Sequence, residues 1–126
     1  MSSSSYLIDT SVLVDYLRGE SRAADYLKRL KGERCVSVVT VAELYAGSNT
    51  QAEQDIMEEF LMAFKILNFD LEIAKIAGLI KKDYAKKYGT GFADALIAAT
   101  AYSHQAVIVT LDKKHYQMFK NVEIPN

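Results

Sequence analysis

The sequence contains one cysteine and no apolar run long enough to cross a membrane. A disulfide within the chain is therefore excluded, and the lack of a signal peptide makes a reducing cytoplasm the expected location. The single thiol, Cys35, lies in the apolar segment 34–39. It is interpreted as a small buried hydrophobe rather than a reactive nucleophile.

The chain also lacks an excess of charge of either sign. Lys and Arg total 15 and Asp and Glu total 16, which gives a net charge of −1. This balance excludes a general attraction to nucleic acid, so any contact with RNA or DNA must come from a local patch or a bound cation. One such patch is a basic helix face formed by Lys75, Lys81, Lys82, Lys86 and Lys87. The sequence leaves open whether this face is simply solvated or contacts phosphates.

Glycine-rich phosphate loops are absent as well. The chain has neither G-x-x-x-x-G-K-[ST] nor G-x-G-x-x-G after a strand, so nucleoside triphosphate and dinucleotide sites lack their usual loops. A phosphoaspartate enzyme or receiver domain is disfavoured on other grounds. Ser11 stands two residues after Asp9, where aspartyl phosphatases carry a second Asp, and no Lys-Pro pair follows the last expected strand.

What the sequence does have is enough apolar residues for one compact domain, since half of its 126 residues are apolar. Residues 1–5, which are mostly serine, are left out of the predicted fold as a disordered or added start, and residues 6–126 form the predicted single domain. Short apolar runs at 6–8, 34–39, 65–69 and 107–110 indicate strands. They alternate with amphipathic or buried helical segments, which predicts an α/β fold with a central parallel sheet and helices on both faces.

Four acidic residues follow these strands or begin a buried helix: Asp9, Glu43, Asp94 and Asp112. Each has a plain explanation as a helix cap; for example, Thr40 and Glu43 have the spacing of a capping box. Their shared position supports a second explanation, because ligands of open α/β sheets bind outside the carboxyl ends of the strands. We expect the topology to gather the four carboxylates at that edge.

Carboxylates brought together in this way repel one another, which either raises their pKa values or requires a cation between them. Oxygen ligands without paired Cys or His suit Mg²⁺ or Mn²⁺ rather than zinc. The two histidines, His104 and His115, have no H-x-x-x-H spacing and are interpreted as surface or packing residues. A magnesium-like ion in an acidic pocket favours phosphodiester hydrolysis as the reaction.

Four segments resemble, in order and spacing, the motifs of PIN-domain ribonucleases, and the short chain most resembles the VapC-type toxins of toxin–antitoxin pairs. The segments are 7–12, 40–44 with Gly47, 93–101 and 110–112. The resemblance extends from residue 7 to about residue 119, and the segment that contains Asp94 is its most specific part. It implies a PIN-like α/β fold.

The resemblance also implies roles for individual residues. Asp9, Glu43, Asp94 and Asp112 would form the acidic catalytic set, with Asp9, Asp94 and Asp112 as metal ligands and Glu43 placing or activating water. The supporting hydroxyl groups would be those of Thr10, Ser11 and Thr110. Asp112 is the least secure ligand, because the final acid varies with Asn in the family and many relatives carry Phe where Tyr116 stands.

The implied function is that of a Mg²⁺- or Mn²⁺-dependent endoribonuclease toxin, typically a homodimer, inhibited by an antitoxin whose C-terminal segment lies across the acidic groove. Leu13, Tyr16, Tyr45 and Phe60 could contact this partner, but packing in the core explains them equally well. Two alternatives remain open: a housekeeping PIN nuclease acting on ribosomal RNA or on DNA, and a non-catalytic protein whose acidic pocket binds a basic partner. No membrane association is expected.

Overall fold

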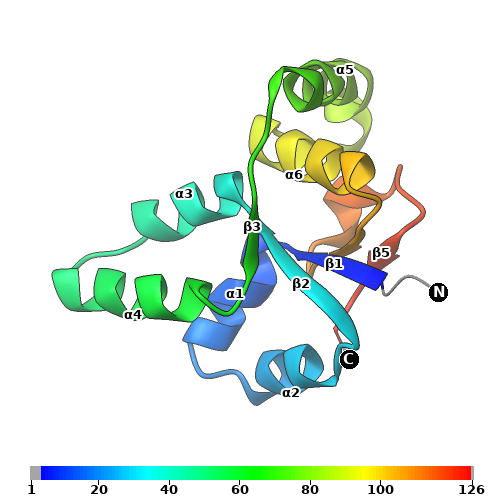
Figure 1. Ribbon diagram of the computed structural model, residues 1–126. Helices are drawn as coiled ribbons and strands as arrows, with labels where there is room; N and C mark the ends of the chain where they lie inside the picture. Colours follow the sequence, from blue (N-terminus) through cyan, green and yellow to red (C-terminus); the bar gives the residue numbers. More distant parts are fainter. Residues whose placement is uncertain (1–3, 126) are drawn as a thin grey trace.

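A five-stranded, wholly parallel sheet with the order β3-β2-β1-β4-β5 forms the centre of the computed structural model, which describes residues 4–125 (Figure 1). The strands are β1 (Ser4–Ile8), β2 (Gly32–Ser37), β3 (Lys65–Leu67), β4 (Val107–Val109) and β5 (Val122–Glu123). The chain builds outward from the central β1 to β3, then returns to the other side of β1 for β4 and β5. The α/β fold with a parallel sheet, predicted from the sequence, is confirmed.

Helices cover both faces of this sheet. They are α1 (Thr10–Leu17), α2 (Ser21–Arg29), α3 (Val38–Ala46), α4 (Gln51–Leu61), α5 (Leu71–Tyr88), α6 (Phe92–Ser103) and the short 3₁₀ helix η1 (Lys113–Tyr116). Figure 1 shows α5 and α6 on one side of the sheet and α1, α2 and α4 on the other. Among the residues described, no helix combines the length and the apolar character needed to cross a membrane.

The alternation of side chains along the strands divides the core into two halves. Leu7, Cys35 and Ile108 pack with α5 and α6, whereas their neighbours Ile8 and Val109 pack with α1, α2 and α4. Successive residues of a strand point to opposite faces, so a strand segment that is apolar at consecutive positions suits a sheet covered on both sides. This explains the continuous apolar runs at the end of β1 and in β4, whereas the starts of β1 and β2 are polar.

Cys35 is part of this core. Its side chain is 1% exposed, and burial, with a further contribution from the nearby charge of Glu33, raises the pKa of the thiol to about 11. The thiolate is therefore disfavoured at neutral pH. The interpretation of Cys35 as a small buried hydrophobe is confirmed.

The first strand begins earlier than the sequence predicted. Ser4 pairs with Gly32 and Ser5 with Glu33 in the parallel ladder between β1 and β2, so the predicted domain start at residue 6 is two residues late. The polar side chains gave no strand signal there, but strand pairing uses backbone groups. The remainder of the predicted serine-rich start, residues 1–3, lies outside the described residues.

The boundary between β2 and α3 also differs from the prediction. β2 ends at Ser37, whose hydroxyl oxygen accepts a hydrogen bond from the backbone N–H of Val39 and caps α3. Thr40 is therefore buried inside the helix instead of capping it, and the capping box proposed for Thr40 and Glu43 is wrong. A β-branched run enters the helix here because its tertiary packing outweighs its weak helix propensity.

The four apolar residues considered as partner contacts lie in or against the core. Leu13 is fully buried, Tyr16 stacks on Phe60 with ring centroids 4.8 Å apart, and Tyr45 packs against the same core cluster. Core packing is thus the explanation that holds for these residues.

The close approach of β1 and β2 at Gly32 gives a stability prediction. A Cβ atom added at Gly32, where φ is +156°, would lie 2.2 Å from the carbonyl oxygen of Ser4. Gly32→Ala should therefore lower the free energy of unfolding by about 1–3 kcal/mol, measured by urea denaturation. The control is Gly78→Ala in α5, where an added Cβ meets nothing within 4 Å and should stabilise the helix by roughly 0.5–1 kcal/mol. A neutral Gly32→Ala would contradict the close contact between the strands.

Candidate active site

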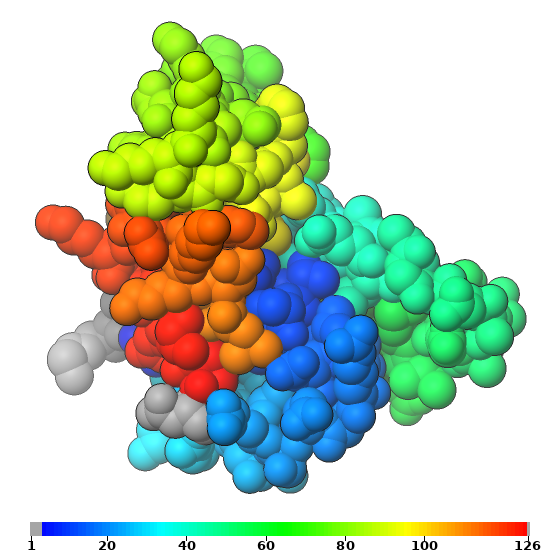
Figure 2. Space-filling model, turned by 180° about the vertical axis from the view of Figure 1, so that it is seen from behind, coloured from blue at the N-terminus to red at the C-terminus, as the bar shows by residue number. Residues whose placement is uncertain are grey.

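The predicted acidic residues lie at the carboxyl edge of the sheet, around the ends of β1 and β4. Asp9 directly follows β1 and Thr110 directly follows β4. β1 and β4 are the neighbouring strands at which the strand order reverses, because β2 and β3 lie on one side of β1, and β4 and β5 on the other. Ligands of open α/β sheets bind at such a switch point. Figure 2 shows the start of α1 (blue), the start of α6 (yellow) and η1 (orange) meeting on one face of the molecule.

Asp9 is buried, with 6% of its surface exposed, and its carboxylate is bound by hydroxyl groups. Its Oδ2 accepts hydrogen bonds from Ser11 at 3.0 Å and from Thr110 at 2.7 Å. These hydroxyl groups are oriented in turn by backbone N–H groups: Leu111 donates to Ser11 at 3.1 Å and Asp112 donates to Thr110 at 2.9 Å. Donors linked in series polarise one another, which suits the solvation of a buried negative charge.

Within residues 4–125, none of these four acids caps a helix with its side chain from the N-cap position, although Asp94 accepts a hydrogen bond from the backbone N–H of Gly91 at the start of α6. Asp9 occupies the position before α1, but within the described residues its side chain makes no capping hydrogen bond, and the same is true of Asp112 before η1. The residue that precedes α6 is Gly91, so Asp94 lies in the first turn and is not the N-cap. Glu43 lies in the interior of α3.

Tyr116 connects the first two acids. Its hydroxyl group donates to Oδ1 of Asp9 at 3.2 Å and to Oδ1 of Asp94 at 3.3 Å. One proton is therefore shared between two carboxylates whose residues are far apart in the sequence. The prediction that Asp9 and Asp94 come together is confirmed.

Asp112 joins the cluster through His115. Nδ1 of His115 lies 2.7 Å from Oδ2 of Asp112 and 3.1 Å from Oδ2 of Asp94. Residues three apart lie one above the other in a 3₁₀ helix, so η1 and the residue before it bring Asp112 and His115 to the same side. The interpretation of His115 as a surface or packing residue is therefore wrong. It was based on the lack of an H-x-x-x-H pair, and that test does not detect a contact between an Asp and a His three residues apart in a 3₁₀ turn.

Glu43 lies at the side of this cluster and is exposed. Its Oε1 accepts a hydrogen bond of 2.6 Å from the hydroxyl group of Thr10, which also lies 3.0 Å from the hydroxyl group of Thr40. Because Thr10 follows Asp9 in the chain, it links Glu43 to the buried carboxylate. The structure thus gathers all four predicted acids, with Glu43 joined indirectly.

Several carboxylates meet in this site, and the burial of the site favours the neutral form of its ionisable groups. Burial raises the pKa of Asp94; the nearby charge of His115 lowers it, and that of Asp9 raises it further. Burial also raises the pKa of Tyr116 far above its ordinary range, with smaller contributions from Asp9 and Asp94. Tyr116 therefore remains a neutral hydrogen-bond donor. Its position in the site was missed at the sequence level because an aromatic residue at this place is typical of a core.

A hydrated magnesium ion suits this donor set. As the side chains lie, the described part of the chain holds no group of three or more Asp, Glu, His or Cys residues that could bind a metal ion. Mg²⁺, however, usually keeps several of its waters and binds through one or two carboxylates together with substrate phosphates, rather than in a cage made of protein. The facing oxygens of Asp9 and Asp94 fit that requirement.

Comparisons with known proteins agree on one family. The family model of the PIN domain matches residues 6–121. Ribonuclease VapC10 of Mycobacterium tuberculosis is 34% identical over 122 residues, which cover 94% of this chain and 91% of the relative. Ribonuclease VapC19 of the same organism is 36% identical over 123 residues, which cover 94% and 98% of the two chains.

A solved structure extends this likeness to three dimensions. A chain in a toxin–antitoxin complex from Klebsiella pneumoniae superposes with a TM-score of 0.84 at 25% identity. The superposition covers 96% of this chain and 98% of that one. The likeness therefore includes the whole sheet and the helices that carry the acidic cluster.

The raised pKa of Asp94 predicts how stability depends on pH. Because the folded protein holds this proton more tightly than the unfolded chain does, stability is lost as Asp94 ionises with rising pH. Asp94→Asn should therefore raise the melting temperature of the metal-free protein at neutral pH. The gain should shrink as the pH is lowered below the folded-state pKa, when the wild-type carboxyl group is itself neutral.

Thermal unfolding at several pH values in the presence of EDTA measures this difference. Asp83→Asn is the control, because Asp83 is an exposed carboxylate of α5 and its replacement should change the melting temperature little. Destabilisation by Asp94→Asn at every pH would contradict the prediction and would show that the hydrogen bonds of this carboxylate outweigh its repulsion.

Proposed function

The chain belongs to the PIN-domain family and, within it, to the VapC ribonucleases, and from this premise we propose that it is a metal-dependent endoribonuclease toxin held in check by a cognate antitoxin. The observation that carries the proposal is the pairing of Asp9 with Asp94 at the switch point of the sheet, where each presents an oxygen to the other across one hydroxyl group. Two acids held this close suit a divalent cation.

In this proposal Asp9 and Asp94 hold Mg²⁺ or Mn²⁺, and Asp112 contributes from the side of His115. When bound, such an ion would lower the pKa of a bound water and stabilise the charge that develops on the phosphate oxygens. Ser11 and Thr110 keep the Asp9 carboxylate in one orientation through their hydrogen bonds. These hydroxyl groups therefore serve as the supporting residues of the site.

Glu43 is the proposed general base. Its exposed carboxylate is fixed at one oxygen by Thr10 and lies beside the acidic cluster instead of within it. A carboxylate in that position can orient an attacking water and accept its proton. Thr10 then acts as the residue that positions Glu43.

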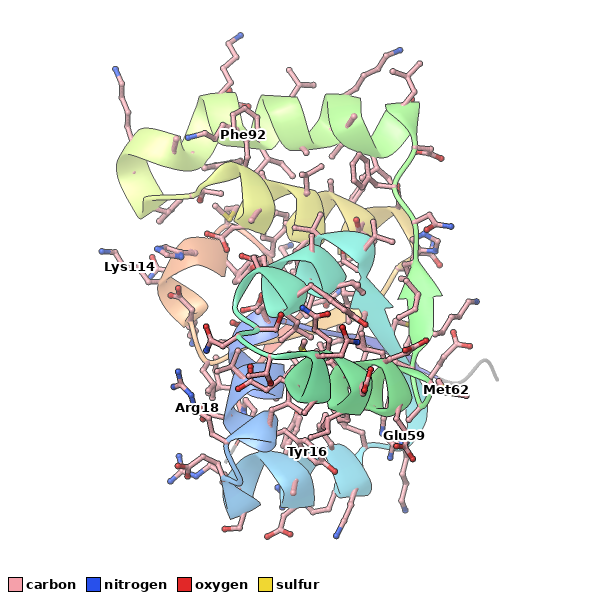
Figure 3. The ribbon with its side chains drawn as sticks, turned by 90° about the vertical axis from the view of Figure 1, so that its left-hand side faces the viewer. Tyr16, Arg18, Glu59, Met62, Phe92 and Lys114 are labelled. Atoms are coloured by element: carbon pink, nitrogen blue, oxygen red, sulfur yellow. The ribbon has the colours of Figure 1, made fainter. Side chains whose placement is uncertain are left out.

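Four lysines beside the acids are the proposed contacts for the RNA backbone. The end of α5 lies against η1, since a Cβ atom added at Gly89 would be 3.6 Å from Nε2 of His115. Lys86 and Lys87 belong to the last turn of α5, and Lys113 and Lys114 are exposed on η1. Figure 3 shows Lys114 extending outward on the same side of the molecule as Arg18. A local basic patch of this kind compensates for the absence of overall positive charge.

The proposed antitoxin segment occupies an apolar groove next to Glu43. The groove has a volume of about 390 Å³ and is lined by Val14, Leu17, Leu44, Ile56 and Met57, with Arg18 and Glu43 among its polar residues. A segment bound there would lie across the approach to the acidic cluster. We also propose that the protein is a homodimer and that it acts in the cytoplasm.

The first test replaces a proposed metal ligand. Wild-type protein incubated with tRNA and Mn²⁺ should produce fragments that disappear when EDTA is added. Asp9→Asn should abolish cleavage while the circular dichroism spectrum stays that of the folded protein. Glu43→Gln should reduce the rate by about 100- to 10,000-fold, the usual contribution of a general base.

Two outcomes count against this function. Full activity of pure Asp9→Asn would remove the proposed mechanism. A wild-type protein that binds RNA or a basic peptide but yields no metal-dependent fragments would instead support the non-catalytic alternative.

The second test concerns the lysines. In the Asp9→Asn background, which keeps the RNA intact, Lys113→Ala with Lys114→Ala should weaken binding of single-stranded RNA. The slope of log affinity against log salt should fall by roughly 0.7 for each phosphate that the variant no longer neutralises. The control pair is Lys31→Ala with Lys120→Ala, because these exposed lysines precede β2 and β5 at the opposite, amino end of the sheet. Equal slopes for the two pairs would rule out binding of RNA by η1.

A further inference from the structure

Tyr116 is an almost fully buried residue of the acidic cluster whose side chain has a polar end. It is 1% exposed, and its ring belongs to the core cluster that packs against α5 and α6, with the ring of Phe119 at a centroid distance of 6.4 Å. Only its hydroxyl group reaches the carboxylates. A phenylalanine would fill the same space in the core, so packing does not explain why a tyrosine stands here.

The hydrogen bonds of the two carboxylates show what the hydroxyl group does. Oδ2 of Asp9 accepts from Ser11 and Thr110, and Oδ2 of Asp94 faces His115. The hydroxyl group of Tyr116 donates to the other oxygen, Oδ1, of each carboxylate, and the backbone N–H of Gly91 also donates to Asp94. The Tyr116 hydroxyl group therefore stands between the two negative charges at the place where they approach each other.

We propose that the Tyr116 hydroxyl group is a neutral stand-in for the metal ion: it holds Asp9 and Asp94 together in the metal-free protein and gives up their Oδ1 atoms when the ion binds. The inference rests on the proposed metal site. A neutral donor compensates only part of two charges, so the cation still binds, but it must displace a hydrogen bond to each carboxylate. Tyr116 thereby weakens the metal affinity while it stabilises the metal-free fold.

This role makes a prediction opposite to that of a residue that pre-organises the site. Tyr116→Phe leaves two facing carboxylates without their shared donor, which destabilises the metal-free protein more than the metal-bound protein. The variant should therefore melt at a lower temperature without metal but bind Mg²⁺ about tenfold more tightly. Metal-dependent stabilisation should be larger in the variant than in the wild type.

The experiment follows the melting temperature of the full chain during titration with Mg²⁺ or Mn²⁺. Tyr26→Phe is the matched control, because Tyr26 is also a buried tyrosine whose hydroxyl group donates to a carboxylate, Oε2 of Glu123 at 2.5 Å, outside the acidic cluster. It should lower the melting temperature and leave the response to metal as in the wild type. An equal or weaker metal response of Tyr116→Phe overturns the inference, because the role would then be structural or pre-organising.

Two further measurements separate the possible failures. If the wild type shows no metal-dependent stabilisation, the proposed metal site itself fails, and the inference fails with it. Tyrosine absorption provides a readout that does not need the variant: metal should produce a difference spectrum as the hydroxyl group of Tyr116 loses its acceptors, in the wild type and in Tyr26→Phe. A wild type that binds metal without this spectrum also overturns the inference.

Discussion

The candidate site depends on holding two carboxylates close together, that of the buried Asp9 and that of the partly buried Asp94. Isolated charges in a buried place are costly, and two of the same sign are more so. The protein offsets this cost with hydroxyl groups from Ser11, Thr110 and Tyr116, which are neutral donors to the Asp9 carboxylate. The resulting site is stable enough to fold and still deficient in positive charge, which is the property a cation-binding site requires.

The parallel sheet supplies the positions from which these groups converge. β1 and β4 are neighbours, so the residues after them, Asp9 and Thr110, lie side by side although they are a hundred residues apart in the chain. α6 returns across the face of the sheet and places Asp94 at its first turn, above the same edge. The two core clusters on opposite faces fix these elements, and the acidic residues lie where the elements end.

The acids differ in their surroundings, and the differences suit different tasks. Asp9 is buried and held from several sides, Asp94 is partly buried with a raised pKa, and Glu43 is exposed and fixed at one oxygen. A buried, oriented carboxylate suits ligation of a cation, whereas an exposed one can exchange protons with water. His115 adds an imidazole between Asp94 and Asp112, on the side of the site next to η1.

The alternating strands and helices, the burial of Cys35 and the meeting of Asp9 with Asp94 could be predicted from the sequence. Apolar periodicity and parallel topology place Asp9 after a strand at the carboxyl edge of the sheet, and Asp94 at the start of a buried helix. Tertiary structure decided the rest. β2 ends at Ser37, two residues earlier than predicted, because the capping hydroxyl group of Ser37 and core packing outweigh the strand preference of the valines that follow. The contacts of His115 and Tyr116 depend on a single 3₁₀ turn that brings an aromatic core residue and an imidazole to the acids from the far end of the chain. Such contacts carry no periodic signal, since they arise only when segments distant in sequence are packed against one another.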